Sequence, residues 1–402
     1  MRSPLTRKLA GFGTTIFTEM TRLANEHGAV NLAQGFPDFD GPMWLKEAAE
    51  RAVREAHGQY ARSAGHPALV EAIAQSIESM RGLSYDPMSE ITVTCGATQA
   101  IHAAISAICD VGDEVILFEP FYDSYRACVC QAGATVRAVR LEAPDFALDR
   151  QALELAFSAR TRAIVLNTPH NPTGKVFTRE ELSFIGELCQ KHDVICIADE
   201  VYEHLVYTGE HVSIASLPGM RSRTITLSSL SKTFSFTGWR IGWAVADAPL
   251  TEAIRCAHQF STFAAPTPMQ IASVEALRVL ARDSSYRDEL LAEYRGRREL
   301  LMEALSSVGF DVIAPAGAFF VCAGFSRLGY ADDVSLCRAL VTQTKVAAIP
   351  RVPSSSSQHE GRAMCASCFV SVEKPSKRLC DGSKRLLLFM TLFDVTVNVT
   401  RY

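Results

Sequence analysis

"EITVTCGATQAIHAAISAIC", residues 90–109, decides the fold class that the sequence predicts. Its first six residues are rich in β-branched side chains, which is typical of a buried strand. The following residues repeat apolar side chains at helical spacing, so that Ile101, Ile105 and Ile108 share one helix face. A buried strand followed at once by such a helix is the unit from which parallel sheets are built.

The same alternation of strand and helix continues to about residue 245. Further strands are expected at 113–120, 135–142, 162–169, 194–200 and 224–229, and helices at 122–133 and 178–193. Thr178 and Glu181 have the spacing of a capping box at the start of the second of these helices. Apolar strands joined by helices predict an α/β fold with a mainly parallel sheet that is covered on both faces.

A smaller α/β domain is expected after this sheet, because 402 residues exceed the usual size of one core. Residues 268–308 have a helical pattern, and "FDVIAPAGAFFVCAGF" (310–325) predicts two paired strands around Pro315–Gly317. The expected divisions are an N-terminal segment 1–45 that joins the small domain, a large domain 46–290, a small domain 291–350 and a tail 351–402.

The bulk composition argues against several classes of function. Hydrophobic residues make up 48% of the chain and charged residues 21%, as in ordinary globular proteins. The formal net charge of -4 offers no basic excess for nucleic acid, and the apolar runs are shorter than the ~20 residues of a membrane helix. Residues 1–13 lack the apolar stretch of a secretory signal, and the cysteines favour a reducing compartment. We expect a cytoplasmic protein, with the mitochondrion as the alternative.

The tail differs in character from the rest of the chain. "RVPSSSSQHEGRAMCASC" (351–368) is typical of a loop or of disorder, and "SKRLLLFMTLFDVTVNV" (383–399) could form a pair of strands. Cys365 and Cys368 form half of a zinc-binding pattern, with His359 and Cys380 as neighbours. A single such pair is more often structural or incidental, so no metal is expected.

Small and polar residues follow the predicted strands at the points where those strands end. Gly96–Gln99 open a helix with free backbone N–H groups and a hydroxyl, which suits a phosphate but also an ordinary helix cap. Tyr122 could cover a flat ring or simply pack in the core. Asn171 precedes a proline, where a plain turn is the alternative. Ligands of parallel sheets bind beyond these strand ends.

Charged residues continue this series. Asp199 lies at the end of an apolar strand, where burial is costly unless a cation pairs with it. Lys232 lies between hydroxyl residues in "SSLSKTFSFTGWR" (228–240), and Arg240 closes the same stretch. Since most lysines point into water, Lys232 by itself would indicate only an exposed loop.

Together these groups match the needs of pyridoxal 5'-phosphate. Its aldehyde requires a lysine for a Schiff base, and its pyridine nitrogen requires a carboxylate. Its phosphate requires arginine and backbone donors, and its phenolic oxygen requires hydrogen bonds. We therefore expect Lys232 to hold the aldehyde, and Arg240 and Ser229 to bind the phosphate.

Five segments resemble the fold-type I, class I/II aminotransferases. They are "NLAQGFPDF" (31–39), "GQYARSAGHPALVEAIA" (58–74), "TPHNPTGKVF" (168–177), "ADEVYEHLVY" (198–207) and "SLSKTFSFTGWRIGW" (229–243). The resemblance is to the branch of kynurenine–oxoglutarate transaminase, glutamine transaminase K and methionine aminotransferase, and it extends to about Pro350. It implies the fold-type I architecture of pyridoxal-phosphate-dependent transferases.

The resemblance also implies a role for each polar group. Lys232 would hold the cofactor and then shuttle the proton between the substrate α-carbon and the cofactor. Asp199 would pair with the pyridine nitrogen, and Tyr122 would stack on the ring. Asn171 and Tyr202 would bond the phenolic oxygen. The implied catalytic residues are Lys232, Asp199 and Tyr202.

The remaining implied contacts concern the phosphate, the substrate and a neighbouring subunit. The phosphate would be held by Gly96, Ala97, Thr98, Ser229 and Arg240. The substrate carboxylate would lie over the backbone of Gly35 and close to Asn171. Tyr60 would reach the phosphate of the neighbouring subunit, which implies a homodimer with shared active sites.

The chain departs from the family pattern after Pro350. The family continues with a serine-containing loop and a short strand whose arginine clamps the substrate carboxylate, whereas this chain reads "RVPSSSSQHEGRAMC" (351–365). Arg351 and Arg362 are the nearest arginines, but neither lies in the expected setting. A bidentate arginine supplies both charge and orientation and is not easily replaced.

Three functions therefore stay open. The first is transamination of an aromatic or sulfur-containing amino acid, of the kynurenine, glutamine or methionine type, with a 2-oxo acid as acceptor. The second is β-elimination with the same cofactor, as in a cysteine-conjugate or C–S lyase. The third is a variant that binds the cofactor, or only dimerises with a full-length partner, without efficient turnover. A general nucleotide binder lacks support, because the glycine-rich phosphate motifs are missing.

Overall fold

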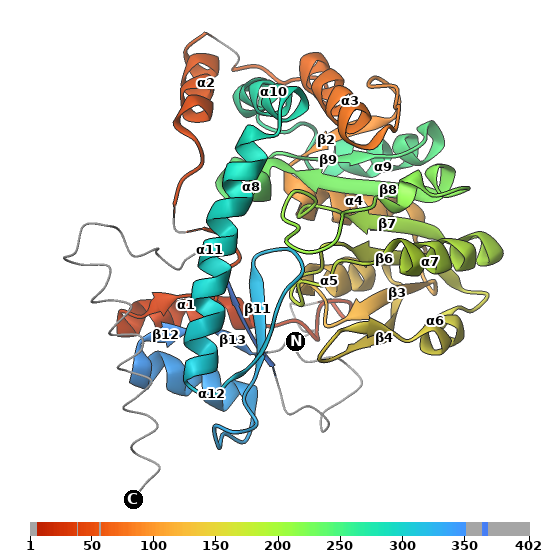
Figure 1. The fold of residues 1–402 in the computed structure, drawn as a ribbon. Helices are drawn as coiled ribbons and strands as arrows, with labels where there is room; N and C mark the ends of the chain where they lie inside the picture. Colours follow the sequence, from red (N-terminus) through yellow and green to blue (C-terminus); the bar gives the residue numbers. More distant parts are fainter. Residues whose placement is uncertain (1–5, 38, 56–57, 351–363, 369–402) are drawn as a thin grey trace, which may run out of the picture.

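The computed structural model describes residues 6–37, 39–55 and 58–350, together with the backbone of 364–368. Figure 1 shows a large sheet with helices on both faces and, beside it, a smaller unit. In that unit the N-terminal helix α1 (Ile16–His27) lies next to elements from the end of the described chain.

The large sheet is mainly parallel, as expected. Its strands follow the order β2 (Ile91–Thr94), β9 (Gly242–Val245), β8 (Thr224–Ser229), β7 (Ile195–Asp199), β6 (Thr161–Asn167), β3 (Glu114–Glu119), β4 (Thr135–Glu142) and β5 (Ala147–Leu148). β9 runs antiparallel to β2 and β8, and β5 runs antiparallel to β4. The other neighbouring pairs are parallel, so the chain places the ends of β6, β7 and β8 at one edge.

Both faces of this sheet are buried. Successive side chains of a strand point to opposite faces, so each central strand contributes to two hydrophobic clusters. In β3, Val115 and Leu117 join a cluster with α4 (Gly96–Ile108), α5 (Asp123–Ala132) and α9 (Ala248–Ser261). Ile116 and Phe118 join a different cluster with α6 (Arg150–Ala156) and α7 (Arg179–His192). This alternation explains why β3 is apolar at nearly every position.

A third cluster covers the β2 end of the sheet. It combines apolar side chains of α2 (Met43–Arg54), α3 (Pro67–Arg81) and α10 (Thr267–Arg282) with β2 and β9. Leu230 of the short helix α8 (Leu230–Thr233) belongs to the same cluster. The turn that carries Lys232 is therefore anchored in a hydrophobic core.

The smaller unit joins the two ends of the described chain. Its sheet has the order β10 (Asp311–Ile313), β11 (Phe320–Gly324), β14 (Met364–Cys368) and β13 (Ile349–Pro350), and β1 (Val30–Asn31) pairs with β12 (Val346–Ala347). Met20 of α1 packs in one core with residues of α11 (Ser285–Ser307) and α12 (Asp333–Ala339). The expected division of the chain into domains, with its N-terminal segment and its boundaries, stays a prediction.

Most of the expected elements are confirmed. The capping box of Thr178 and Glu181 forms at the start of α7, and β10 and β11 pair as an antiparallel hairpin. One expectation is wrong in part: residues 364–368, assigned to a loop, form strand β14 between β11 and β13. The segment Met-Cys-Ala-Ser-Cys does not alternate between apolar and polar side chains, and it forms a strand because its backbone pairs with a neighbour on each side. The expected strands in 383–399 lie outside the described residues, as do the side chains of the paired cysteines.

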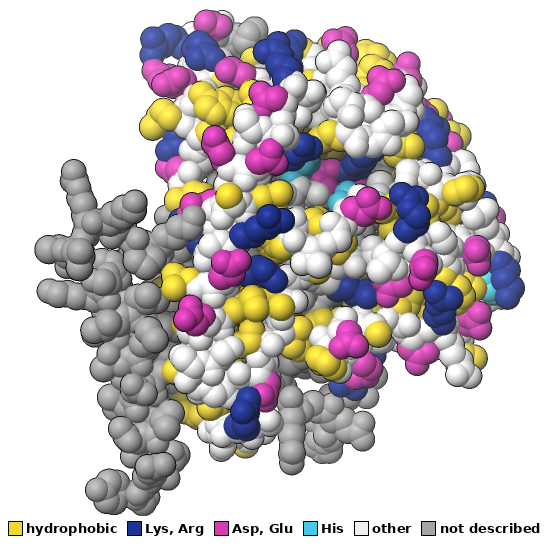
Figure 2. All heavy atoms as spheres, viewed as in Figure 1, with side chains coloured by type: hydrophobic (Ala, Val, Ile, Leu, Met, Phe, Trp, Pro, Cys, Tyr) yellow, Lys and Arg dark blue, Asp and Glu magenta, His cyan; other side chains and the backbone are white. Residues whose placement is uncertain are grey.

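Acidic and basic side chains are interspersed on the face seen in Figure 2. Such mixing keeps the electrostatic field of either sign short-ranged. Within the described ranges, the helices are all too short or too polar to cross a membrane.

Candidate active site

The site begins at the ends of three neighbouring parallel strands. Asn167, Asp199 and Ser229 are the last residues of β6, β7 and β8. Asn167 lies opposite Asp199 in the register of β6 and β7. The parallel arrangement therefore collects polar groups that are thirty or more residues apart in the chain, as the rule for ligand sites in open sheets predicts.

These strand ends open into a cavity of about 470 Å³. Ten of the residues expected from the sequence line it, namely Gly35, Ala97, Thr98, Tyr122, Asn171, Asp199, Tyr202, Ser229, Lys232 and Arg240. A cavity of this size is in the range of small-molecule sites in proteins.

Lys232 lies in the first turn after β8, and its side chain extends into the cavity. Its Nζ donates a hydrogen bond of 2.7 Å to the carbonyl oxygen of Gly35. The same nitrogen lies 4.9 Å from the ring centroid of Phe319 and 5.5 Å from that of Tyr202. The ammonium group is thus held by a carbonyl and by two aromatic faces, which attract a cation.

Asp199 is a buried carboxylate with mainly neutral partners. The Tyr125 hydroxyl donates a hydrogen bond of 2.7 Å to its Oδ2, and the Val201 backbone N–H reaches its Oδ1. Burial raises the pKa of Asp199 to about 6, although these hydrogen bonds and the charge of Lys232 act in the opposite direction. A carboxylate in this state favours the approach of a further cationic group.

The start of α4 and Arg240 form an end of the cavity that is suited to bind an anion. Arg240 donates to the carbonyl oxygens of Thr237 and Cys95, which places its guanidinium above the first turn of α4. A Cβ at Gly96 would lie 2.4 Å from a guanidinium nitrogen, and the φ of +76° at Gly96 also favours glycine. The backbone N–H groups of the first helical turn, a guanidinium and nearby hydroxyls together suit a phosphate.

Two predicted residues do not line the cavity. Gly96 lies beneath Arg240 and contributes its backbone conformation. Tyr60 is 82% exposed, and its ring packs edge-on against Phe263 at 5.1 Å between centroids. Its expected contact with a neighbouring subunit stays a prediction.

Several lining residues were not foreseen from the sequence. They are Thr15, Phe17, Phe36, Ile101, Asp123, Ser124, Tyr125, Asn167, Val201, Ser231, Thr237 and Phe320. Asn167 could have been found, since it ends a predicted strand; its side chain donates to the Asp199 carbonyl oxygen and accepts from the Asn171 N–H. Phe17, Phe36 and Phe320 come from segments whose place beside the sheet only the folded chain reveals.

The donor set fits pyridoxal phosphate. An amine, a buried carboxylate of raised pKa and an anion-binding helix start line one cavity. The steric need for glycine at position 96 is a feature of this structure that a generic pocket would not require. The residues present could therefore hold the aldehyde, the ring nitrogen and the phosphate of such a group.

Comparison with known proteins agrees with this geometry. The family model "Aminotransferase class I and II" matches residues 28–369. Methionine aminotransferase of Escherichia coli is 41% identical over 344 residues, covering 85% of this chain and 88% of that protein. The chain belongs to the class I and II aminotransferases, and is thus a pyridoxal-phosphate-dependent aminotransferase.

Other relatives carry different substrate names. Probable N-succinyldiaminopimelate aminotransferase DapC of Mycobacterium tuberculosis is 43% identical over 347 residues, covering 85% of this chain and 86% of that protein. Human kynurenine–oxoglutarate transaminase 3 is 40% identical over 338 residues, covering 80% of this chain and 74% of that protein. A solved structure of the E. coli methionine aminotransferase has a TM-score of 0.88 at 38% identity, covering 97% of this chain and 98% of that chain. The described part of the chain therefore has the fold of this family.

Proposed function

We propose that this protein transfers the amino group of an aromatic or sulfur-containing amino acid to a 2-oxo acid. The observation that carries the proposal is the placement of Lys232 and Asp199 in one cavity with the anion-binding start of α4. A lysine amine, a buried carboxylate and a phosphate seat in one cavity serve few other chemistries.

Each end of the cavity has a proposed role in holding the cofactor. Arg240, Ser229, Thr98 and the backbone at Ala97 would bind the phosphate. Asp199 would keep the pyridine nitrogen protonated, which is consistent with a carboxylate that lacks an arginine partner among the described residues. Bound pyridoxal phosphate would supply an acceptor for the electron pair left at the substrate α-carbon.

The remaining side chains orient the ring and move the proton. Tyr122 would cover the ring, and Asn171 and Tyr202 would hydrogen-bond its phenolic oxygen. Lys232 Nζ would accept the proton from the substrate α-carbon and deliver it to the cofactor. Its contact with the Gly35 carbonyl shows that the side chain reaches the cavity wall on the side proposed for the substrate.

The rest of the lining favours a neutral amino-acid side chain. Phe17, Phe36 and Phe320 present aromatic surface to the cavity. Among the described lining residues, Lys232 and Arg240 are the only lysine and arginine, and both already have proposed roles. The α-carboxylate of the substrate already lacks a dedicated cation among these residues, and a side-chain carboxylate would lack one as well, so methionine, glutamine or kynurenine fits better than an acidic donor.

A homodimer with shared sites is also proposed. Tyr60 and its neighbour Phe263 expose aromatic surface, and Tyr60 in particular has 82% of its area accessible. Sedimentation of the full-length protein would test the dimer, and mixed Tyr60 and Lys232 variants would test the sharing.

A second candidate function is a cofactor-binding protein with impaired turnover. Strand β14 stands in the small unit next to β11, and its Cys368 lies in register with Phe320, a cavity residue. The five residues of β14, Met-Cys-Ala-Ser-Cys, include no arginine to clamp a substrate carboxylate. This strand is the observation that favours the second candidate.

One half-reaction separates the candidates. The protein would be loaded with pyridoxal phosphate and mixed with methionine, glutamine, kynurenine or N-succinyldiaminopimelate without any oxo acid. Loss of the visible absorbance of the lysine-bound cofactor, with formation of its amine form, is expected and would support transamination. An absorbance that no amino acid changes would support the impaired variant. A cysteine conjugate that yields pyruvate and ammonia instead would indicate β-elimination.

A further inference from the structure

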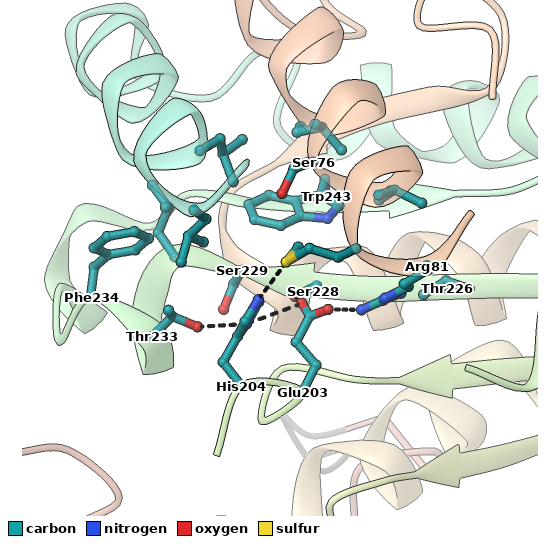
Figure 3. A pocket seen from close by; sticks show the side chains of 16 residues that line it. Ser76, Arg81, Glu203, His204, Thr226, Ser228, Ser229, Thr233, Phe234 and Trp243 are labelled. Carbon is teal, nitrogen blue, oxygen red and sulfur yellow. Dashed lines mark hydrogen bonds and ion pairs between the residues drawn. The ribbon is translucent and has the colours of Figure 1, made fainter. Parts of the chain in front are cut away.

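A buried cluster of charged and polar side chains lies behind the turn that carries Lys232 (Figure 3). Arg81 comes from the end of α3, and Glu203 and His204 come from the segment after β7. Their side chains are at least 89% buried, since 11%, 8% and 8% of their surface is accessible. The reaction proposed above uses none of these three residues.

Arg81 forms ion pairs with both carboxylates of the cluster. Its guanidinium pairs with Glu203 and, at 2.8 Å, with Glu200. Burial alone would raise the pKa of Glu200, but Arg81, His211 and Ser213 together hold it below its ordinary value. Glu200 thus has its cationic partner within the chain.

Glu203 contacts the segment just before the lysine turn. The Ser228 hydroxyl donates a hydrogen bond of 2.5 Å to Glu203 Oε1. Ser228 directly precedes Ser229, which lines the cavity. Because Arg81 pairs with Oε2, both oxygens of the Glu203 carboxylate are held.

His204 contacts the residue just after the lysine. Its Nδ1 lies 3.2 Å from the Thr233 hydroxyl, and its Nε2 lies 3.4 Å from the thioether sulfur of Met80. A thioether only accepts, so Nε2 carries the proton and Nδ1 accepts from Thr233. Burial keeps the pKa of His204 well below its usual range, which agrees with a neutral ring.

A metal site is the alternative reading of the same cluster. Ligand atoms of Glu200, Glu203 and His211 lie within 4.8 Å of one another. Arg81 already pairs with both carboxylates, so a metal ion would have to displace a buried guanidinium. The geometry therefore describes an internal ion pair.

We propose that Glu203 and His204 form a clamp that positions Lys232, with Arg81 as its counter-charge. The two side chains follow one another in the chain, and their hydrogen bonds bracket the segment 229–232, one at Ser228 and one at Thr233. They are positioning residues, because they act through these two hydroxyls and do not line the cavity. The inference rests on the role of Lys232 proposed above.

The first test removes one hydroxyl without changing side-chain shape. Thr233→Val deletes the bond to His204, and Thr233→Ser keeps it. Thr251→Val is the matched control, because Thr251 is another buried threonine whose hydroxyl bonds a backbone carbonyl, that of Ala246, away from the cavity. In Thr233→Val we expect kcat to fall about ten-fold with KM nearly unchanged, since small misplacements of a reacting group are costly.

A second readout is independent of activity. Amide hydrogen exchange in residues 229–234 of the full chain is expected to quicken in Thr233→Val, with and without cofactor, and to stay as in the parent protein in Thr233→Ser and Thr251→Val. Faster exchange with an unchanged kcat would overturn the positioning role. Unchanged exchange in Thr233→Val would overturn the clamp itself.

A double-mutant cycle identifies the partner. His204→Asn keeps an acceptor near the position of Nδ1 and should retain more activity than His204→Leu. Thr233→Val combined with His204→Leu should cost little more than either change alone, because both remove the same bond. Fully additive losses would overturn the pairing. If instead the parent protein forms no lysine-bound cofactor at all, the proposed function fails, while the exchange result still decides the clamp.

Discussion

Asp199 and Glu200 are neighbours in the chain and are both buried, yet their surroundings differ completely. Asp199 faces the cavity and accepts a hydrogen bond from the neutral hydroxyl of Tyr125. Glu200 faces the cluster behind the cavity and pairs with Arg81, His211 and Ser213. The pKa of Asp199 is accordingly raised by burial to about 6, whereas that of Glu200 is lowered.

The difference separates the carboxylate that we propose to act in the reaction from a structural one. Glu200 has its counter-charge within the chain, so its ion pair is complete without a ligand. Asp199 is ionised at some cost in free energy, and a cationic ligand at its position would relieve that cost. Burial alone does not distinguish the two residues, but the charge of their partners does.

The largest expected effect comes from Lys232 itself. Lys232→Ala should abolish the absorbance of lysine-bound cofactor and slow turnover by about 10⁴-fold, because both the attachment and the proton transfer are lost. Lys232→Arg keeps the positive charge, but it should lose the absorbance and the turnover to the same extent. A normal cofactor spectrum in Lys232→Ala would remove this lysine from the site.

Asp199→Asn should separate chemistry from folding. The amide can still accept the Tyr125 hydrogen bond, but it cannot stabilise a protonated ring nitrogen, so kcat should fall by about 10²–10³-fold while cofactor stays bound. Absorbance titration and steady-state kinetics measure the two quantities. Unchanged activity would mean that Asp199 has no part in the reaction.

Glu200→Gln should show the opposite pattern. It leaves Arg81 with one carboxylate fewer in a buried setting, which is expected to lower the free energy of unfolding by about 3 kcal/mol. Denaturant unfolding measures this loss. If Glu200→Gln reduced kcat at full occupancy and left stability intact, the contrast between the two carboxylates would be wrong.

The pH dependence of stability should differ in sign at the two positions. The pKa of Asp199 in the folded protein, about 6, lies above its ordinary value of 3.8, so its stabilising contribution is complete below pH 3.8 and is lost as the pH rises through 6. Without cofactor, the stability of Asp199→Asn relative to the parent should therefore grow by on the order of 3 kcal/mol between pH 4 and 7. The pKa of Glu200 is lowered, so its contribution should be lost as the pH falls. If the free energies of unfolding of the parent and of Asp199→Asn changed in parallel with pH, the raised pKa of Asp199 would be contradicted.

The smallest effect is expected at Tyr125. Tyr125→Phe removes a bond that lowers the pKa of Asp199, so this pKa should rise and the acidic limb of the activity profile should move to higher pH. The loss of one hydrogen bond is worth about 1 kcal/mol. Tyr207→Phe, which removes a buried hydroxyl bond to Ala318, is the matched control and should leave the profile in place.

Local sequence patterns account for much of the fold and for most of the cavity. Strands such as 135–142 and the capping box of α7 follow from spacing and side-chain type, and the structure has them where expected. The rule that ligands bind beyond the ends of parallel strands located Asp199, Asn171 and Lys232 without any contact information. Strand β14 was missed, because its five residues do not alternate between apolar and polar side chains and the strand depends on pairing with β11 and β13.

What the sequence determined by itself is the class of fold and the chemical set of the site, since both depend on residue types at fixed spacing along the chain. What only the tertiary structure decided is which buried charge meets which partner. Asp199 and Glu200 carry the same kind of group one residue apart, and successive residues point in different directions. Arg81 pairs with Glu200 and Glu203 because α3 packs behind the lysine turn, and no local pattern encodes that contact.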